Sequence, residues 1–131
     1  MHTLALLALG VDRPGIVAAV TGSFVGHGVN IEDSQMSILG GHFAMVLILA
    51  APNEVDPDQL RGELEEVGLR LGLEGISLNA VSPAPDASAE PTHLVSLYGA
   101  DHPGIVHRVT VALAAAGVNV TNLTTRLADD V

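Results

Sequence analysis

The chain has 131 residues, of which 48% are hydrophobic and only 2% aromatic, and its formal net charge is −10. A chain of this length and apolar content can bury a core, here an aliphatic one, which excludes a disordered protein. The negative charge excludes direct nucleic-acid binding, because contact with phosphates needs a basic surface.

Lysine and cysteine are both absent from the chain. All five basic residues are arginine, and there is no cysteine. Without lysine there is no phosphate-loop lysine, no Schiff base and no polybasic membrane patch. Without cysteine there is no disulfide, thiolate nucleophile or cysteine-ligated metal. No apolar run approaches about 18 residues, so we expect no membrane association and a soluble, cytoplasmic protein.

The first elements are a strand and a helix. Residues 3–9 are apolar at nearly every position, which predicts a strand buried on both faces. Residues 12–14 form a turn, with Pro14 expected as the first helical residue. An apolar stripe at helical spacing follows, and Gly28 is expected to end the helix in a left-handed conformation.

A hairpin comes next. Residues 29–39 predict a strand whose inward face shifts near Asp33 and Ser34, which indicates a bulge there. Gly40 and Gly41 predict the turn, and residues 42–51 predict a third strand that is apolar on both faces.

A second helix begins at residues 56–59, where acidic residues and Pro57 form a capping pattern. Its expected buried face consists of Leu60, Leu64, Val67 and Leu71. Residues 73–82 then predict the fourth strand.

The order strand, helix, strand, strand, helix, strand predicts an α+β, ferredoxin-like βαββαβ fold, an antiparallel sheet with both helices on one face. Its first and third strands are central, and these are the two that are apolar on both faces. Either central strands merely tolerate extra apolar residues, or the helix-free face is covered by another sheet. That sheet would come from the second repeat or from a second chain, and we favour this interpretation.

The stretch GVDRPGIV at residues 10–17 returns 89 positions later as GADHPGIV at residues 99–106. The triplet GVN at residues 28–30 returns at residues 117–119, and between Gly10 and Asn30 eleven of 21 positions are identical at this offset. A repeat this dense indicates one structural unit present twice.

The repeat gives the expected domain organisation: a first domain at residues 1–82, a linker at 83–91 and an incomplete second copy at 92–131. In the second copy we expect a strand at 92–98, a helix at 103–116 and a strand at 118–127. Half a unit should not fold alone, because its strand edges and helix face are bare. We therefore expect either that the chain continues or that the first unit or a partner completes it, and we favour continuation.

The repeated loop has the chemistry of a small binding site. A helix that begins at Pro14-Gly15 leaves the N–H groups of Gly15, Ile16 and Val17 without intrahelical partners, which favours a carboxylate. The neighbouring Asp12 would attract an ammonium group, so the pair suits a zwitterion, with the Asn30 amide as a further donor and acceptor. The alternative is structural: Asp12 caps the helix, Gly15 permits close packing and Asn30 bonds the backbone.

These motifs resemble the ACT domain, a family of small ferredoxin-like regulatory modules that typically bind amino acids. Tandem copies are most similar to the glycine cleavage system transcriptional repressor family, which has two ACT domains and no catalytic domain. The resemblance implies a ligand between two units, held by the first strand–helix loop of one and the second strand of the other. The implied ligand-binding residues are Asp12, Arg13, Gly15, Ile16, Asn30, Ile31, Asp101, His102, Gly104, Ile105, Asn119 and Val120.

We therefore expect a regulatory protein rather than an enzyme. It would sense a small amino acid such as glycine or serine and act through contact with a regulatory partner or as a homo-oligomer. Transcriptional regulation of amino-acid metabolism is one candidate output. The six histidines are scattered, so no metal or other cofactor is expected, and no nucleophile has an orienting third group. Two alternatives stay open: the N-terminal regulatory part of a phosphoserine phosphatase or formyltetrahydrofolate deformylase, and a ligand-free oligomerisation module.

Overall fold

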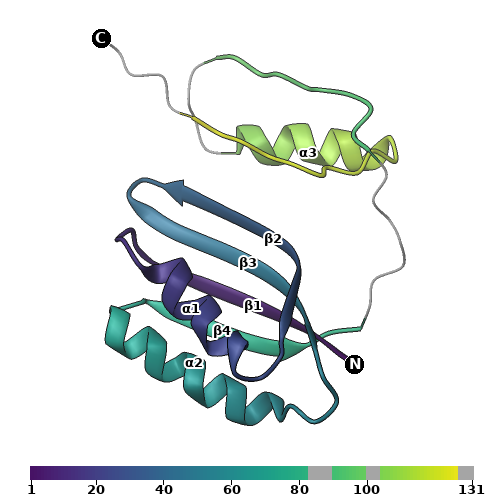
Figure 1. Cartoon of the computed structure of the whole chain (residues 1–131). Coiled ribbons are helices and arrows are strands. Elements are labelled where there is room, and N and C mark those ends of the chain that lie inside the picture. The colour runs from purple at the N-terminus through teal and green to yellow at the C-terminus, as the bar shows by residue number, and fades with distance from the viewer. Residues whose placement is uncertain (83–89, 100–103, 127–131) are drawn as a thin grey trace. The chain divides into compact units, whose positions relative to one another are not determined.

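The structure is a computed structural model that describes residues 1–82, 90–99 and 104–126 (Figure 1). The chain divides into two compact units, Met1–Pro85 and Asp86–Val131. None of the helices in the described ranges has both the length and the apolar content needed to cross a bilayer.

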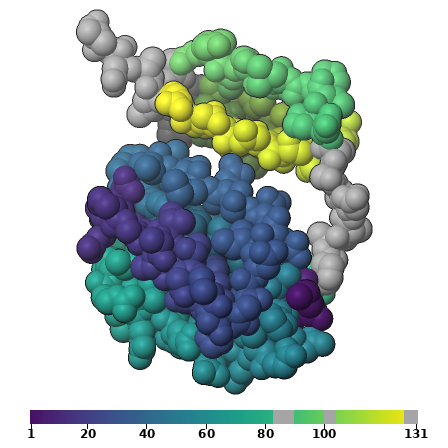
Figure 2. Space-filling view, viewed as in Figure 1, coloured from purple at the N-terminus to yellow at the C-terminus, as the bar shows by residue number. Residues whose placement is uncertain are grey.

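The first unit has the predicted order of elements. They are β1 His2–Val11, α1 Ile16–Val25, β2 Asn30–Leu39, β3 His42–Ala51, α2 Pro57–Leu71 and β4 Gly75–Ala80. The sheet is antiparallel with the order β2-β3-β1-β4, so β1 and β3 are central. Both helices lie on one face of it (Figure 1), and their atoms make up part of the near face of the unit in Figure 2. The ferredoxin-like prediction is confirmed.

The core lies between this sheet and the two helices. It is built from alternate residues of the strands and from one stripe of each helix, as the periodicity predicts. The helices contribute Ile16, Val20 and Phe24 from α1, and Leu60, Leu64 and Val67 from α2. No polar or charged residue is buried among the described residues. The first unit is therefore held together by aliphatic packing.

Glycines fix two of the turns. Gly28 has a φ of 69°, and the N–H of Val29 donates to the carbonyl of Phe24 at 3.2 Å, which is the Schellman pattern. The predicted left-handed end of α1 is therefore confirmed. Gly40 and Gly41 have φ values of 57° and 78°, as a tight hairpin turn requires.

The edge strand β2 carries the bulge that the sequence predicts. Its register against β3 shifts between Ile31 and Asp33, so Glu32 is the extra residue. The bulge is one residue earlier than expected.

The end of α2 explains an error in the predicted fourth strand. β4 runs from Gly75 to Ala80 and not over residues 73–82. It starts later than predicted because the N–H of Leu73 donates to the carbonyl of Gly68 at 2.8 Å and caps α2. At the other end of the helix, the Asp56 side chain accepts from the N–H of Asp58 at 3.0 Å, as predicted.

The described part of the second unit contains one helix, α3 Ile105–Ala115, and no strand. The strands predicted at residues 92–98 and 118–127 are therefore wrong over the described positions, while Pro103 and Leu127 lie outside them. In the first unit β1 and β2 do not pair with each other, because β3 lies between them and pairs with both. Residues 90–99 and 104–126 hold no counterpart of β3, so their extended segments have no ladder partner.

Two glycines give a paired test of this packing. A Cβ at Gly10 would lie 2.8 Å from Cδ2 of Leu73 and 3.2 Å from its Cα, whereas a Cβ at Gly62 of α2 would meet nothing within 4 Å. We expect Gly10→Ala to lower the free energy of unfolding by about 1–3 kcal/mol through overpacking. Gly62→Ala should raise it by about 0.5–1 kcal/mol through helix propensity. Urea unfolding measures both, and equal stability of the two variants would contradict the packing described.

Candidate functional site

The loop between β1 and α1 is fixed on two sides by hydrogen bonds. The N–H of Asp12 donates to the carbonyl of Gly41 at 3.0 Å, which ties the loop to the β2–β3 hairpin. On the other side, Nη1 of Arg13 donates to the carbonyl of Leu71, at the end of α2, at 3.1 Å. This hydrogen bond uses one N–H of the Arg13 guanidinium to hold the loop against the end of α2. The other N–H groups of the guanidinium can donate to a ligand.

Gly15 is the turning point of this loop. It is the N-cap of α1, with a left-handed φ of 94° and ψ of −3°, so the helix begins at Ile16. The expectation that Pro14 is the first helical residue is wrong, because the left-handed turn at Gly15 separates Pro14 from the helix. The first intrahelical bond runs from the N–H of Ala19 to the carbonyl of Gly15 at 3.0 Å.

The N-terminal end of α1, which we call the helix mouth, presents unpartnered amide groups. No side chain caps α1, and its first turn contains no acidic residue, so the N–H groups of Ile16, Val17 and Ala18 are free to bind an anion. The sequence predicts the set of free N–H groups one residue too early and omits that of Ala18, because it predicts an earlier start of the helix.

The mouth is open to solvent. Asp12 and Gly15 are exposed, and nothing lies within 4 Å of a Cβ built on Gly15. The Ile16 side chain, in contrast, is only 2% exposed, so Ile16 can offer a ligand its N–H but not its side chain.

Asn30 and Ile31 lie at the other end of the sheet. Asn30 is opposite Ala50 of β3, whereas the β1 residue that precedes Asp12 is opposite His42. With about 3.3 Å per residue, the eight residues from His42 to Ala50 span roughly 26 Å. β3 also separates β2 from β1, so the expectation that the Asn30 amide joins Asp12 at one ligand is wrong within a single unit. One unit alone cannot bring Asp12 and Asn30 to one ligand.

The second helix mouth repeats the first in conformation. Gly104 has a φ of 88° and ψ of −2° and is the N-cap of α3, without a side-chain cap. The N–H of Arg108 donates to its carbonyl at 3.0 Å, as Ala19 does to Gly15. Thr21 and Thr110, 89 positions apart, also make matching hydroxyl bonds, to the carbonyls of Val17 at 2.8 Å and Val106 at 2.9 Å.

The other predicted residues of this loop are less well placed. Asp101 and His102 lie outside the described residues. Ile105 is half-buried, and Asn119 and Val120 are exposed and belong to no strand.

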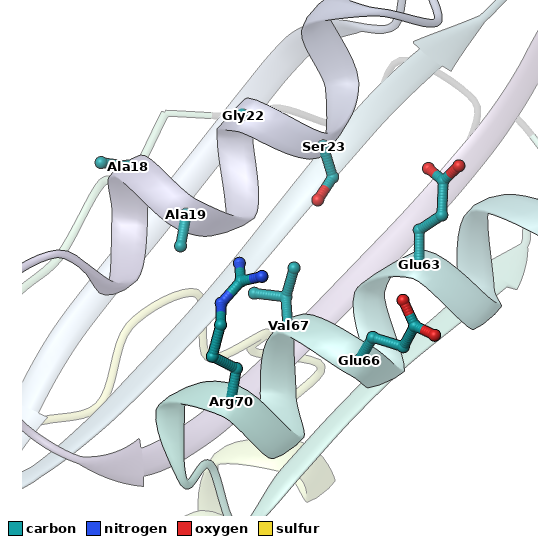
Figure 3. Close-up of a pocket in the computed structure, with 8 residues that line it drawn as sticks. All are labelled: Ala18, Ala19, Gly22, Ser23, Glu63, Glu66, Val67 and Arg70. Carbon is teal, nitrogen blue, oxygen red and sulfur yellow. The ribbon is translucent and has the colours of Figure 1, made fainter.

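A shallow groove of about 410 Å³ lies between α1 and α2 (Figure 3). It is lined by Ala18, Ala19, Gly22, Ser23, Glu63, Glu66, Val67 and Arg70. The run of small residues on α1 is the sequence signal for this groove. Near the end of α1, Nε2 of His27 lies 2.7 Å from Oε2 of Glu63 and links the two helices. Within the described residues, no three His, Asp or Glu side chains come together as a metal site would require.

With this geometry in view, the comparisons with known proteins assign the family. The ACT domain family model matches residues 2–75, and the chain belongs to the ACT domain family. A UPF0237 protein of Pyrobaculum aerophilum is 42% identical over 74 residues, which cover 56% of this chain and 82% of that protein.

A longer relative matches the second repeat as well as the first. The glycine cleavage system transcriptional repressor of Escherichia coli is 31% identical over 126 residues, 95% of this chain. The chain spans 65% of the length of that repressor.

Solved structures give the same fold. An ACT domain protein from Streptococcus pneumoniae is 29% identical and superposes with a TM-score of 0.55, covering 60% of this chain and 89% of its own. A formyltetrahydrofolate deformylase from Burkholderia mallei is 21% identical with a TM-score of 0.56, covering 61% of this chain and 28% of its own. At that identity the second similarity shows the fold alone.

The left-handed conformation of Gly15 can be tested by comparing its substitution with that of Gly22, which lies inside α1. Alanine at Gly15 would be forced into a left-handed conformation, which costs about 1–2 kcal/mol. Gly22, inside α1, has no positive φ, and a Cβ built on it would meet nothing within 4 Å. We expect Gly15→Ala to lower the midpoint of thermal unfolding and Gly22→Ala to raise it. The assignment of Gly15 fails if both variants are stabilised.

Proposed function

We propose that this chain is a regulatory protein that binds a small amino acid at its two helix mouths and acts through protein–protein contact. The observation that carries the proposal is the shared geometry of the mouths. Gly15 and Gly104 take nearly the same left-handed conformation, and each opens a helix that no side chain caps. A ligand carboxylate would accept from the N–H groups of Ile16, Val17 and Ala18.

Asp12 supplies the other half of the recognition. Its exposed carboxylate follows β1 directly and lies in the same loop as Gly15, where it would attract the ammonium group of an amino acid. A bare anion such as phosphate would be repelled by it. This combination of charges selects a zwitterion over a simple anion.

Two units complete each site in this proposal. Because Asn30 and Ile31 lie far from Asp12 within the first unit, they would contact a ligand held by the loop of another unit, from a second copy or a regulatory partner. Asn119 and Val120 would do the same for the second loop, where Asp101 and His102 take the places of Asp12 and Arg13. Binding would then change how units associate, which is a direct way for a sensor to act on a partner.

The relatives support a choice of ligand and output. Similarity to a glycine cleavage system transcriptional repressor favours glycine or serine as the ligand and transcription of amino-acid metabolism as the output. The chain's charge of −10 directs such an output through a DNA-binding partner and not through direct contact with DNA. We propose no catalytic role, since the loop offers no nucleophile with an orienting base.

A ligand-free interaction module is the second candidate. It is favoured by the internal use of two predicted site residues: Arg13 donates to the carbonyl of Leu71, and Ile16 packs in the core. In this case the two mouths serve only to turn the chain into α1 and α3.

Thermal unfolding with each common amino acid separates the two candidates. A ligand at 100 times its dissociation constant stabilises the folded state by about 2.7 kcal/mol, which shifts the melting temperature by several degrees. We expect glycine or serine to produce the shift and inorganic phosphate to produce none. If no amino acid shifts the melting temperature, the ligand-free module is correct.

Asp12→Asn tests the ammonium contact. The substitution keeps the size of the side chain but removes its charge, and a hydrogen bond to a charged group contributes about 1.5–3 kcal/mol, or roughly 10–100-fold in affinity. We expect that loss in isothermal titration with the identified ligand. Glu65→Gln is the matched control, because Glu65 is an exposed carboxylate on α2. Unchanged affinity in Asp12→Asn would refute the role given to Asp12.

A further inference from the structure

The helix-free face of the sheet carries an apolar stripe along its two central strands. It consists of Ala5, Leu7 and Leu9 of β1 and Ala44, Val46 and Ile48 of β3. These residues alternate with buried residues of the same strands, so their side chains point away from α1 and α2. Leu7 is 47% exposed, and Leu9 and Val46 are each 44% exposed.

Polar or small residues border the apolar stripe on both sides. On β2 the neighbours of its β3 residues are Asp33, Gln35 and Ser37. On β4 the neighbours of its β1 residues are Gly75, Ser77 and Asn79. Of the twelve positions, Asp33 alone is ionisable, and it lies at the rim. An apolar centre with a polar rim is the anatomy of a protein–protein interface.

The charge of the molecule bears on the kind of partner. The chain has 15 acidic and five basic residues, yet the three cross-strand pairs of the stripe carry no charge at all. A basic partner would be drawn to the acidic surfaces elsewhere. The stripe instead fits a surface that is itself neutral and apolar, and the chain possesses such a surface.

The sizes of the side chains make the apolar stripe complementary to itself. Its three cross-strand pairs are Ala5 with Ile48, Leu7 with Val46, and Leu9 with Ala44. Each outer pair joins one large and one small side chain, and the large one changes strand from one end to the other.

A two-fold axis parallel to the strands and midway between β1 and β3 places β1 of one copy over β3 of the other. Leu9 then faces Ala44 of the second copy, and Ile48 faces its Ala5, so that every large side chain at the ends meets a small one. In the middle, Leu7 faces Val46. Two sheets can pack in this way at about 10 Å with nearly aligned strands.

We propose that the apolar stripe is the interface through which two copies of this chain form a dimer, sheet against sheet. The stripe lies on the face opposite α1, so the inference does not rest on amino-acid binding at the helix mouths. Dimerisation and ligand binding are measured separately, and either can fail without the other.

Sedimentation equilibrium of the full chain is the first test. We expect a reversible, concentration-dependent dimer. Leu7→Asp places a charge at the centre of the stripe and should weaken dimerisation by at least about 100-fold. The matched control is Leu69→Asp, since Leu69 is 84% exposed on α2, and it should leave the dimer unchanged. A wild-type chain that stays monomeric, or a dimer insensitive to Leu7→Asp, means a different occupant of the stripe and overturns the proposal.

Exchanging the large and small side chains at positions 9 and 44 tests the two-fold register. This test does not depend on whether the Leu7→Asp variant folds. Leu9→Ala leaves a gap over Ala44 of the second copy, and Ala44→Leu creates a clash with its Leu9. We expect each single variant to weaken the dimer by about tenfold. The double variant restores one large and one small side chain in each contact and should dimerise within about threefold of the wild type. A double variant no better than the weaker single one would overturn the register.

Discussion

The fold of the first unit depends on the pairing of β3 with both of its neighbours. β1 and β2 run in the same direction and are joined by α1, but they have no direct hydrogen bonds, so each needs β3 between them. The second unit shows the converse. Residues 104–126 form α3 with the same loop geometry as α1, and yet residues 90–99 and 116–126 contain no strand. A strand–helix–strand segment therefore forms its helix locally, while its strands depend on a third strand.

The helix mouths show how much backbone conformation is set by local sequence alone. The two copies share Pro-Gly-Ile-Val and Gly-Val-Asn, and their described glycines match within a few degrees: 94° and 88° at Gly15 and Gly104, 69° and 73° at Gly28 and Gly117. The surroundings of the copies differ greatly, since Ile16 is buried and α3 has no buried residue. Left-handed glycines and the short hydrogen bonds around them are thus sufficient to reproduce the loop without a core.

The fold of the first unit could be predicted well from the sequence, because the signals for its helices, strands and turns each lie within a short stretch of the chain. Alternating apolar residues, the Gly40-Gly41 turn and the Asp56 cap each fixed one element, and only element ends were misplaced. Leu73 is an example: its apolar side chain suits a strand, but its N–H caps α2. The candidate site was harder to predict. Asp12 and Asn30 belong to the same repeated motif, but β3 separates the strands that carry them. This separation depends on the order of the strands in the sheet, which a local motif does not reveal. The hydrogen bond from Arg13 to the carbonyl of Leu71 could not be predicted for the same reason, because it joins residues 58 positions apart.

The extra residue Glu32 affects how the molecule behaves in a crowded solution. β2 is the long edge of the sheet, and an edge strand of ten residues in a chain that is 48% hydrophobic would ordinarily invite further strands to add to it. At Glu32 two residues of β2 stand against one of β3, which breaks the regular spacing of N–H and C=O groups along the edge. An incoming straight strand can match this edge only on one side of Glu32. Growth of fibrils from the edge is thereby discouraged, and the carboxylates of Glu32 and Asp33 add repulsion between identical edges.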